Sequence, residues 1–329
     1  MGDCHGREDY TNSITPAPHE PFPLICIVGP TAAGKSDLAL FLAEALGGEV
    51  VNGDSLQVYR GMEIGTAKPS QAERSRVPHH LFDIRDPGEV FTAGDYAREA
   101  RVVLGEMSAR GTLPIVCGGA GFYLRALLDG LADAPPRDEA LRVALEAAEA
   151  RRVGVLHRYL RRLDATAAGR IHARDRHKLV RAIEVCQRAR QALTAVHAQT
   201  RPALEGYRVL KLGLDPLRAQ LYARIEDRVE RMFGGGLLDE VRGLVGQGYT
   251  SESKALESVG YKQCLAHLAG TMTLAAAVAD TKQRTRNYAK RQLTWFRREA
   301  EVVWLSGCGT ERTVRESALL AARKFVARG

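Results

Sequence analysis

The first residues with a clear chemical pattern form a loop with the spacing GxxxxGK[ST]. They are Gly29, Pro30, Thr31, Ala32, Ala33, Gly34, Lys35 and Ser36. In such a loop the glycines let successive backbone N–H groups turn toward one anion, the lysine adds a positive charge, and the serine hydroxyl can ligate Mg²⁺. All eight residues are therefore predicted to bind a diphosphate or triphosphate, with Ser36 as the Mg²⁺ ligand.

A carboxylate, Asp54, is expected beside this anion site. It follows a short apolar run at 49–52, and the carboxyl ends of parallel strands meet at one edge of a sheet. An aspartate after a strand is also a common turn or cap residue. The run at 113–117 ends in glycines and not in the acidic residue that manages Mg²⁺ in many phosphoryl-transfer proteins.

A parallel sheet is needed to hold these residues together. The apolar runs at 24–28 and 113–117 are typical of strands buried on both faces, and helical spacing follows each of them. A strand pattern returns at 210–214, before Asp215 and a proline, a pair that predicts a helix start and a long amphipathic helix through residues 217–232. The predicted fold class is α/β, with a P-loop NTPase-like parallel sheet core and an inserted all-helical domain.

Composition divides the 329 residues into four segments. Residues 1–21 are polar and proline-containing, and are expected to be a flexible tail. Residues 22–130 form the first part of the P-loop core. Residues 131–204 are rich in Ala, Arg, Glu and Leu and predict the helical insertion, and residues 205–329 return to the core with basic C-terminal helices.

The charge balance favours a polyanionic partner. The chain has 47 Lys plus Arg against 39 Asp plus Glu, a formal net charge of +8. Residues 157–191 and 282–298 are strongly basic, with interleaved aromatic side chains that suit phosphate contact and base stacking. A charge-rich helix is also common as a solvated face.

Several classes of protein are disfavoured. The six cysteines are widely spaced, without CxxC pairs, so reduced thiols, a cytoplasmic location and no structural zinc are expected. The adjacent pair His79 and His80 has no further ligands nearby in the sequence and is expected to be structural. No apolar run approaches the roughly 20 residues that cross a bilayer, so no membrane partner is expected.

Longer blocks of sequence make the chain resemble a known family. With the P-loop, residues 52–69, NGDSLQVYRGMEIGTAKP, resemble the tRNA dimethylallyltransferases, also called tRNA isopentenyltransferases. The resemblance covers about residues 24–305 and continues through VPHHLFDI, GGAGFY, RAIEV, RIEDRV, ESVGYK and YAKRQLTWFR. No Cys/His spacing of a zinc finger follows Thr294, as in the bacterial form of the family.

The resemblance implies a reaction. Such enzymes transfer a dimethylallyl group from dimethylallyl diphosphate to N6 of adenosine 37, beside the anticodon, in tRNAs that read codons beginning with U, and release diphosphate. It implies that the P-loop holds the prenyl donor, with Mg²⁺ as cofactor. Asp54 would be the general base, and Lys35 and Arg228 would neutralise the leaving diphosphate. Arg224 precedes Arg228 by one helical turn. A monomer is expected.

The resemblance also implies contacts with the tRNA anticodon stem-loop, whose target base must be extruded to react. The residues expected to make them are Asp54, Ser55, Leu56, Gln57, Ala120, Arg142, His177, Lys178, Leu179, Val180, Arg181, Glu257, Ser258, Val259, Gly260, Tyr261 and Lys262. Most relatives carry Thr or Ser where this chain has Ala120, so one hydroxyl contact is missing.

Two other hypotheses share part of the pattern. A small-molecule or nucleoside kinase would have the glycine loop and a basic aspartate, but it would need ATP and would not need the two basic segments. An NTP-gated RNA-binding switch would need the basic segments but no catalytic residue.

Overall fold

The computed structural model describes residues 20–132, 134–198 and 203–327. Residues 1–19, most of the expected tail, lie outside this range.

A six-stranded, wholly parallel sheet forms the centre of the protein, in the order β3-β2-β4-β1-β5-β6. Its strands are β1 (Phe22–Val28), β2 (Gly48–Asn52), β3 (His79–His80), β4 (Leu113–Cys117), β5 (Tyr207–Leu214) and β6 (Val302–Leu305). The central strand β1 pairs with β4 and β5, so that Ile25 lies between Ile115 and Leu210. The predicted parallel α/β core is confirmed.

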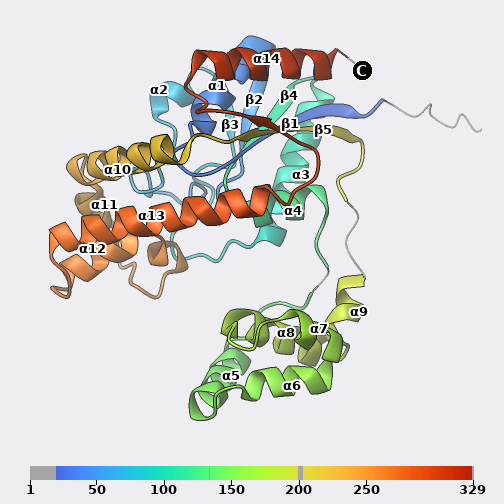
Figure 1. The fold of residues 1–329 in the computed structure, drawn as a ribbon, viewed down its shortest axis with the longest axis vertical. Coiled ribbons are helices and arrows are strands. Elements are labelled where there is room, and N and C mark those ends of the chain that lie inside the picture. Colours follow the sequence, from blue (N-terminus) through green and yellow to red (C-terminus); the bar gives the residue numbers. More distant parts are fainter. Residues whose placement is uncertain (1–19, 133, 199–202, 328–329) are drawn as a thin grey trace, which may run out of the picture.

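Helices cover both faces of the sheet (Figure 1). On one face, α1 (Lys35–Leu46) and α14 (Arg312–Val326) pack their apolar side chains into one buried cluster. On the other face lie α3 (Ala93–Ala109) and α4 (Gly121–Leu128), in a second and larger cluster. These layers explain why β1 and β4 read as continuous apolar runs, since both of their faces are buried.

A group of helices from the C-terminal half lies beside this core (Figure 1). It consists of α10 (Arg218–Gly234), α11 (Leu237–Gly246), the 3₁₀ turn η1 (Lys254–Glu257), α12 (Tyr261–Leu268) and α13 (Leu274–Phe296). The short α2 (Gln71–Arg74) belongs to the long connection between β2 and β3. Helices α10 and α13 pack together through Ile225 and Ala289, both fully buried.

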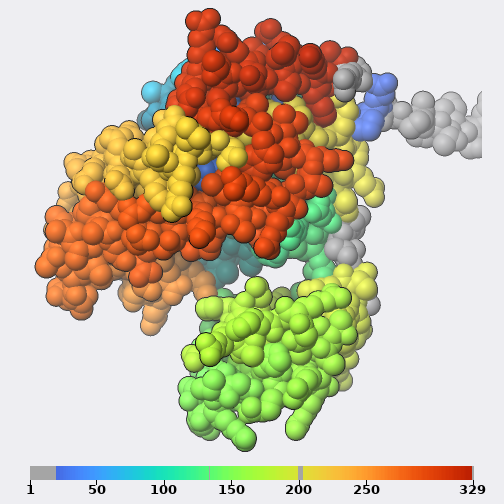
Figure 2. All heavy atoms as spheres, in the orientation of Figure 1, coloured from blue at the N-terminus to red at the C-terminus, as the bar shows by residue number. Residues whose placement is uncertain are grey.

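The helices between α4 and β5 form a body of their own below the sheet (Figure 1). They are α5 (Glu139–Arg151), α6 (Val155–Leu163), α7 (Ala165–Arg170), α8 (Arg176–Ala189) and α9 (Leu193–Ala198). Their buried side chains, with Leu160 and Ile183 at the centre, make a hydrophobic cluster separate from those of the sheet. Figure 2 shows the surface hollowed between this helical body and the core.

The helix start predicted at Asp215 and the following proline is wrong. Helix α10 begins at Arg218, with Leu217 as its N-cap. The carboxylate of Asp215 instead accepts a hydrogen bond from Arg297 at 3.0 Å, and its N–H donates to the Leu305 carbonyl at 3.0 Å. Arg297, at the end of α13, thus occupies the carboxylate that would have capped a helix, and Leu305, at the end of β6, binds the Asp215 N–H.

The two adjacent histidines form the edge strand β3. His79 Nδ1 lies 2.8 Å from the Val77 carbonyl, and His80 Nε2 lies 2.7 Å from a carboxylate oxygen of Glu49. Within the three described ranges, no group of three or more His, Cys, Asp or Glu is arranged to hold a metal. In the same residues, no helix is both long and apolar enough to cross a bilayer.

Candidate functional site

The glycine loop joins β1 to α1 and takes a shape that only small residues allow. Gly29 has φ 138° and Gly34 has φ 82°, and a Cβ on Gly29 would lie 2.9 Å from the Leu214 carbonyl oxygen. The Lys35 ammonium folds back over the loop and donates to the Pro30 carbonyl at 2.8 Å. The loop thus places a helix N-terminus and a lysine at the carboxyl edge of the sheet.

A cleft of about 800 Å³ opens at this edge. Segments distant in sequence line it, among them Thr31, Ala32, Gly34, Lys35, Ser36, Asp54, Ser55, Leu56, Gln57, Thr66, Arg224, Arg228, Glu257, Ser258, Val259, Gly260, Tyr288 and Gln292. The structure therefore brings the predicted P-loop, base, arginine and residues 257–260 into one cavity. Gly29, Pro30 and Ala33 shape the loop without lining the cleft.

Asp54 is held by a turn, and it also faces the cleft. Its Oδ1 accepts the N–H of Leu56 at 2.8 Å, and its own N–H donates to Asn52 Oδ1 at 2.8 Å. The fully buried Asn52 amide in turn donates to the carbonyls of Asp54 and Leu81. Within the described residues no donor pairs with Oδ2 of Asp54, so this oxygen is available to accept a proton.

Positive charge dominates the P-loop side of the cleft. Burial lowers the pKa of Lys35 to about 8, an effect opposed by Cys117 and Asp54 and increased by Arg228. Burial also lowers the pKa of Arg228, against the attraction of Asp54. Both cations are half-buried in the lining of the cleft, so an anion bound between them would be attracted more strongly than in bulk water.

This pKa predicts a pH dependence of donor binding. Lys35 loses its proton as the pH rises through about 8 in the ligand-free protein, so diphosphate affinity should fall above that pH. The Michaelis constant for the diphosphate substrate should therefore rise between pH 7 and 9, while turnover at saturation changes less, because a bound anion restores the proton. In Lys35→Arg the charge persists, and a profile as steep as the parent's would contradict the assignment.

Four predicted RNA contacts lie elsewhere. Arg142, His177, Lys178 and Arg181 line a second cavity, of about 1070 Å³, between the helical body and α3 with α4. This cavity is the hollow of Figure 2. Ala120 is the N-cap of α4 and offers no side-chain hydrogen bond there.

Three of the residues predicted to contact RNA have side chains that lie inside the protein. Leu179, Val180 and Tyr261 have buried side chains, with exposed fractions of 0%, 2% and 0%, and cannot present them to a ligand. Leu179 and Val180 belong to the apolar cluster of the helical body, and the Tyr261 hydroxyl donates to Glu240 at 2.5 Å. The adjacent Lys262, in contrast, is exposed.

Arg142 and Arg181 both bind the buried Glu184. Arg142 donates to its two carboxylate oxygens at 2.7 and 2.8 Å, and Arg181 donates at 2.5 Å. Burial by itself raises the pKa of Glu184, but these bonds and the N–H of Asp138 bring it to about 2. Arg142 therefore joins α5 to α8, and Arg181, which lies on α8 with Glu184, also donates to the Pro135 carbonyl at 3.0 Å; both arginines line the second cavity.

A buried glutamine on α13 was missed by the sequence analysis. Gln292 Oε1 accepts the N–H of Thr31 at 2.7 Å, and its Nε2 donates to the Gly119 carbonyl at 2.9 Å. It thus ties the P-loop to the end of β4. The only sequence signal for Gln292 was its place in the block YAKRQLTWFR, which resembles the family, because one glutamine on a basic helix has no distinctive spacing.

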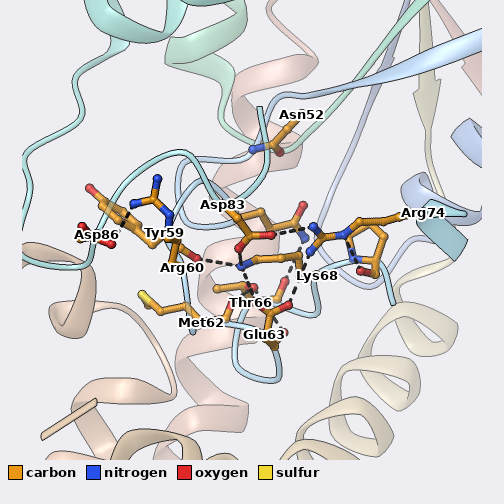
Figure 3. A network of polar contacts seen from close by, with 12 residues as sticks. Asn52, Tyr59, Arg60, Met62, Glu63, Thr66, Lys68, Arg74, Asp83 and Asp86 are labelled. Carbon is orange, nitrogen blue, oxygen red and sulfur yellow. Dashed lines mark hydrogen bonds and ion pairs between the residues drawn. The ribbon is translucent and has the colours of Figure 1, made fainter. Parts of the chain in front are cut away.

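A buried lysine fixes the loop that forms one wall of the cleft (Figure 3). Lys68 Nζ donates to the Tyr59 carbonyl at 2.7 Å and to the carboxylates of Glu63 and Asp83 at 2.8 and 2.5 Å. Arg74 holds the other oxygen of Asp83 at 2.6 Å. Burial raises the pKa of Asp83, but the bonds from Lys68 and Arg74 lower it overall. The wall is therefore anchored from inside the protein.

Known proteins resemble this chain over most of its length. A model of the IPP transferase family matches residues 57–299. The tRNA dimethylallyltransferase of Solibacter usitatus is 54% identical, over 92% of this chain and 99% of its own length, and that of Geobacter metallireducens is 50% identical, over 86% and 92%.

Solved structures agree with this similarity. The tRNA isopentenylpyrophosphate transferase of Bacillus halodurans is 37% identical, with a TM-score of 0.68 over 93% of this chain and 95% of its own. A eukaryotic dimethylallyltransferase acting on tRNA is 26% identical, with a TM-score of 0.80 over 93% and 80%. With its P-loop, carboxylate and arginines gathered in one cleft, the chain belongs to the IPP transferase family.

Proposed function

We propose that this protein transfers the dimethylallyl group of dimethylallyl diphosphate to N6 of adenosine 37 in tRNAs that read codons beginning with U. The observation that carries the proposal is the single cleft in which a P-loop lysine, Lys35, and Arg228 lie with the available carboxylate oxygen of Asp54. The names of the similar proteins support the same reaction.

The donor's diphosphate would bind at the P-loop. Backbone N–H groups at the start of α1, the Lys35 ammonium and the Arg228 guanidinium provide the complementary charge. Oxygen donors that suit Mg²⁺ line the same cleft, namely the Ser36 hydroxyl and the Asp37 carboxylate, and Mg²⁺ commonly takes one or two protein oxygens together with substrate phosphates. Bound there, Mg²⁺ would neutralise part of the diphosphate charge.

Asp54 would serve the acceptor. As the adenine N6 forms its bond to the allylic carbon, the carbon–oxygen bond to the diphosphate breaks and the electron pair leaves with that group. The nitrogen then carries an extra proton, which Asp54 takes through its available oxygen. Ser55, Leu56 and Gln57 line the cleft next to Asp54 and would surround the extruded base.

A product analysis tests this proposal against the two other hypotheses. The purified protein is incubated with bulk tRNA and either dimethylallyl diphosphate or ATP, and the RNA is digested to nucleosides for mass spectrometry. We expect one prenyl mass on adenosine, with the donor only. A phosphorylated product with ATP would indicate a kinase, and RNA binding without any product would indicate a switch.

Salt dependence tests the second cavity as an RNA surface. The Lys178 side chain is 71% exposed and pairs with Asp175, a surface ion pair that contributes little and that RNA phosphate can replace. Lys178→Ala should make the logarithmic slope of tRNA affinity against salt shallower by about 0.7 to 0.9. Lys324→Ala, an exposed lysine on α14, is the matched control. Equal slopes for the two variants would show that Lys178 does not contact RNA phosphate.

A further inference from the structure

A tight turn at residues 63–66 contributes Gly65 and Thr66 to the lining of the cleft. Its carbonyl at Thr66 accepts hydrogen bonds from Gln57 Nε2 at 3.1 Å and Arg228 Nη2 at 3.4 Å. One backbone atom thus contacts a residue on the acceptor side and a residue on the diphosphate side. The position of this turn therefore affects both.

A single carboxylate outside the cleft lining holds the turn. Glu240, on α11, accepts the N–H groups of Glu63 at 2.9 Å, Ile64 at 2.7 Å and Gly65 at 3.2 Å. Its Oε1 also accepts the Tyr261 hydroxyl at 2.5 Å. Three successive N–H groups pointing at one anion form a backbone nest, and such charge-assisted bonds are about twice as strong as neutral ones.

Gly65 and Lys68 also contribute to the contacts that hold the turn. A Cβ on Gly65 would lie 2.3 Å from the Tyr261 ring, so glycine is required for the ring to reach Glu240 across the turn. On the other side of the turn, Lys68 binds the Glu63 carboxylate and the Tyr59 carbonyl (Figure 3). The turn is therefore fixed by a cation on one side and an anion on the other.

We propose that Glu240 is a positioning residue for the transfer reaction: by holding the 63–65 turn, it sets the Thr66 carbonyl that orients Arg228 and Gln57. This inference rests on the proposed function, because it assigns Glu240 an effect on donor binding. It does not require Glu240 to touch either substrate.

The test is a double-mutant cycle with inorganic diphosphate as the probe. Glu240→Gln keeps the size of the side chain but replaces one oxygen by an amide that cannot accept, so two of the four donors lose their acceptor. Diphosphate affinity, measured by calorimetry, should fall by about tenfold. In an Arg228→Ala background the same change should cost less than about threefold, because the residue that the turn orients is absent.

The adjacent carboxylate provides the control. Asp239→Asn lies on the same helix, and its partner is the exposed Arg242. If Glu240 has a purely structural role, Glu240→Gln should lower the melting temperature and reduce diphosphate affinity equally in the parent and in Arg228→Ala. That result would overturn the proposal. So would a diphosphate affinity of Glu240→Gln equal to that of Asp239→Asn. Tyr261→Phe, which removes one of the four donors to Glu240, should give a smaller loss of affinity with the same coupling to Arg228.

The two proposals fail separately. If the parent protein yields no prenylated adenosine, the proposed function is wrong, while the diphosphate cycle still measures the coupling between Glu240 and Arg228. If the parent prenylates tRNA but the cycle is additive, the positioning role alone is wrong.

Discussion

Replacing Asp54 by asparagine should lower the rate of prenyl transfer by about two to four orders of magnitude while tRNA still binds. An asparagine Oδ1 can keep the hydrogen bond from the Leu56 N–H, so the turn should retain its shape. The amide cannot take the N6 proton, so only the rate of the chemical step should fall. Single-turnover kinetics on an anticodon stem-loop, with both substrates saturating, measure that step directly.

An exposed aspartate is the matched control for this substitution. Asp86 pairs with Arg60 at the surface, and Asp86→Asn makes the same chemical change away from the cleft. It should leave the single-turnover rate at the parental value. If Asp54→Asn stays within about tenfold of Asp86→Asn, Asp54 is not the base.

Replacing Arg228 by alanine should affect both the Michaelis constant for the donor and the turnover. The guanidinium lines the cleft, and in the proposed reaction it would face the diphosphate both in the ground state and in the transition state, where negative charge grows on the leaving oxygen. We therefore expect a higher Michaelis constant for dimethylallyl diphosphate and a turnover lower by about two orders of magnitude or more. Steady-state kinetics with varied donor separate the two effects.

Arg218, at the first turn of the same helix, is the control. Its guanidinium lies over the Tyr222 ring and does not line the cleft. Arg218→Ala should therefore leave donor binding unchanged. A turnover defect in Arg228→Ala with an unaltered Michaelis constant for the donor would show that Arg228 acts only in the transition state.

The parts of the site that were predictable follow from local rules. The glycine spacing predicts the loop because positive φ at Gly34 is costly for other residues, and the motif places Lys35 at once. The meeting of Asp54 with the loop follows from a parallel sheet, whose strands all end at one edge. Arg224 and Arg228 share a helix face because one turn separates them.

The parts that could not be predicted depend on long-range geometry. Gln292 meets Thr31 across 261 residues, and Glu240 meets Ile64 across 176, and no spacing identifies which backbone N–H a lone polar side chain will reach. A resemblance transfers whole segments, so it could not separate the exposed Lys178 from the buried Leu179. Helical periodicity, applied to α8, would have separated them.

The order of the strands has a consequence for synthesis on the ribosome. β1 lies at the centre of the sheet and pairs with β5, for example through Phe22 and Tyr207. The ribosome synthesises β5 only after the whole helical body. The helices α5 to α9 pack among themselves, so their contacts are local in sequence and form fast. The inserted body can therefore fold on the nascent chain while one edge of β1 is still unpaired. During that interval the exposed strand edge is the segment most in need of protection from pairing with other chains.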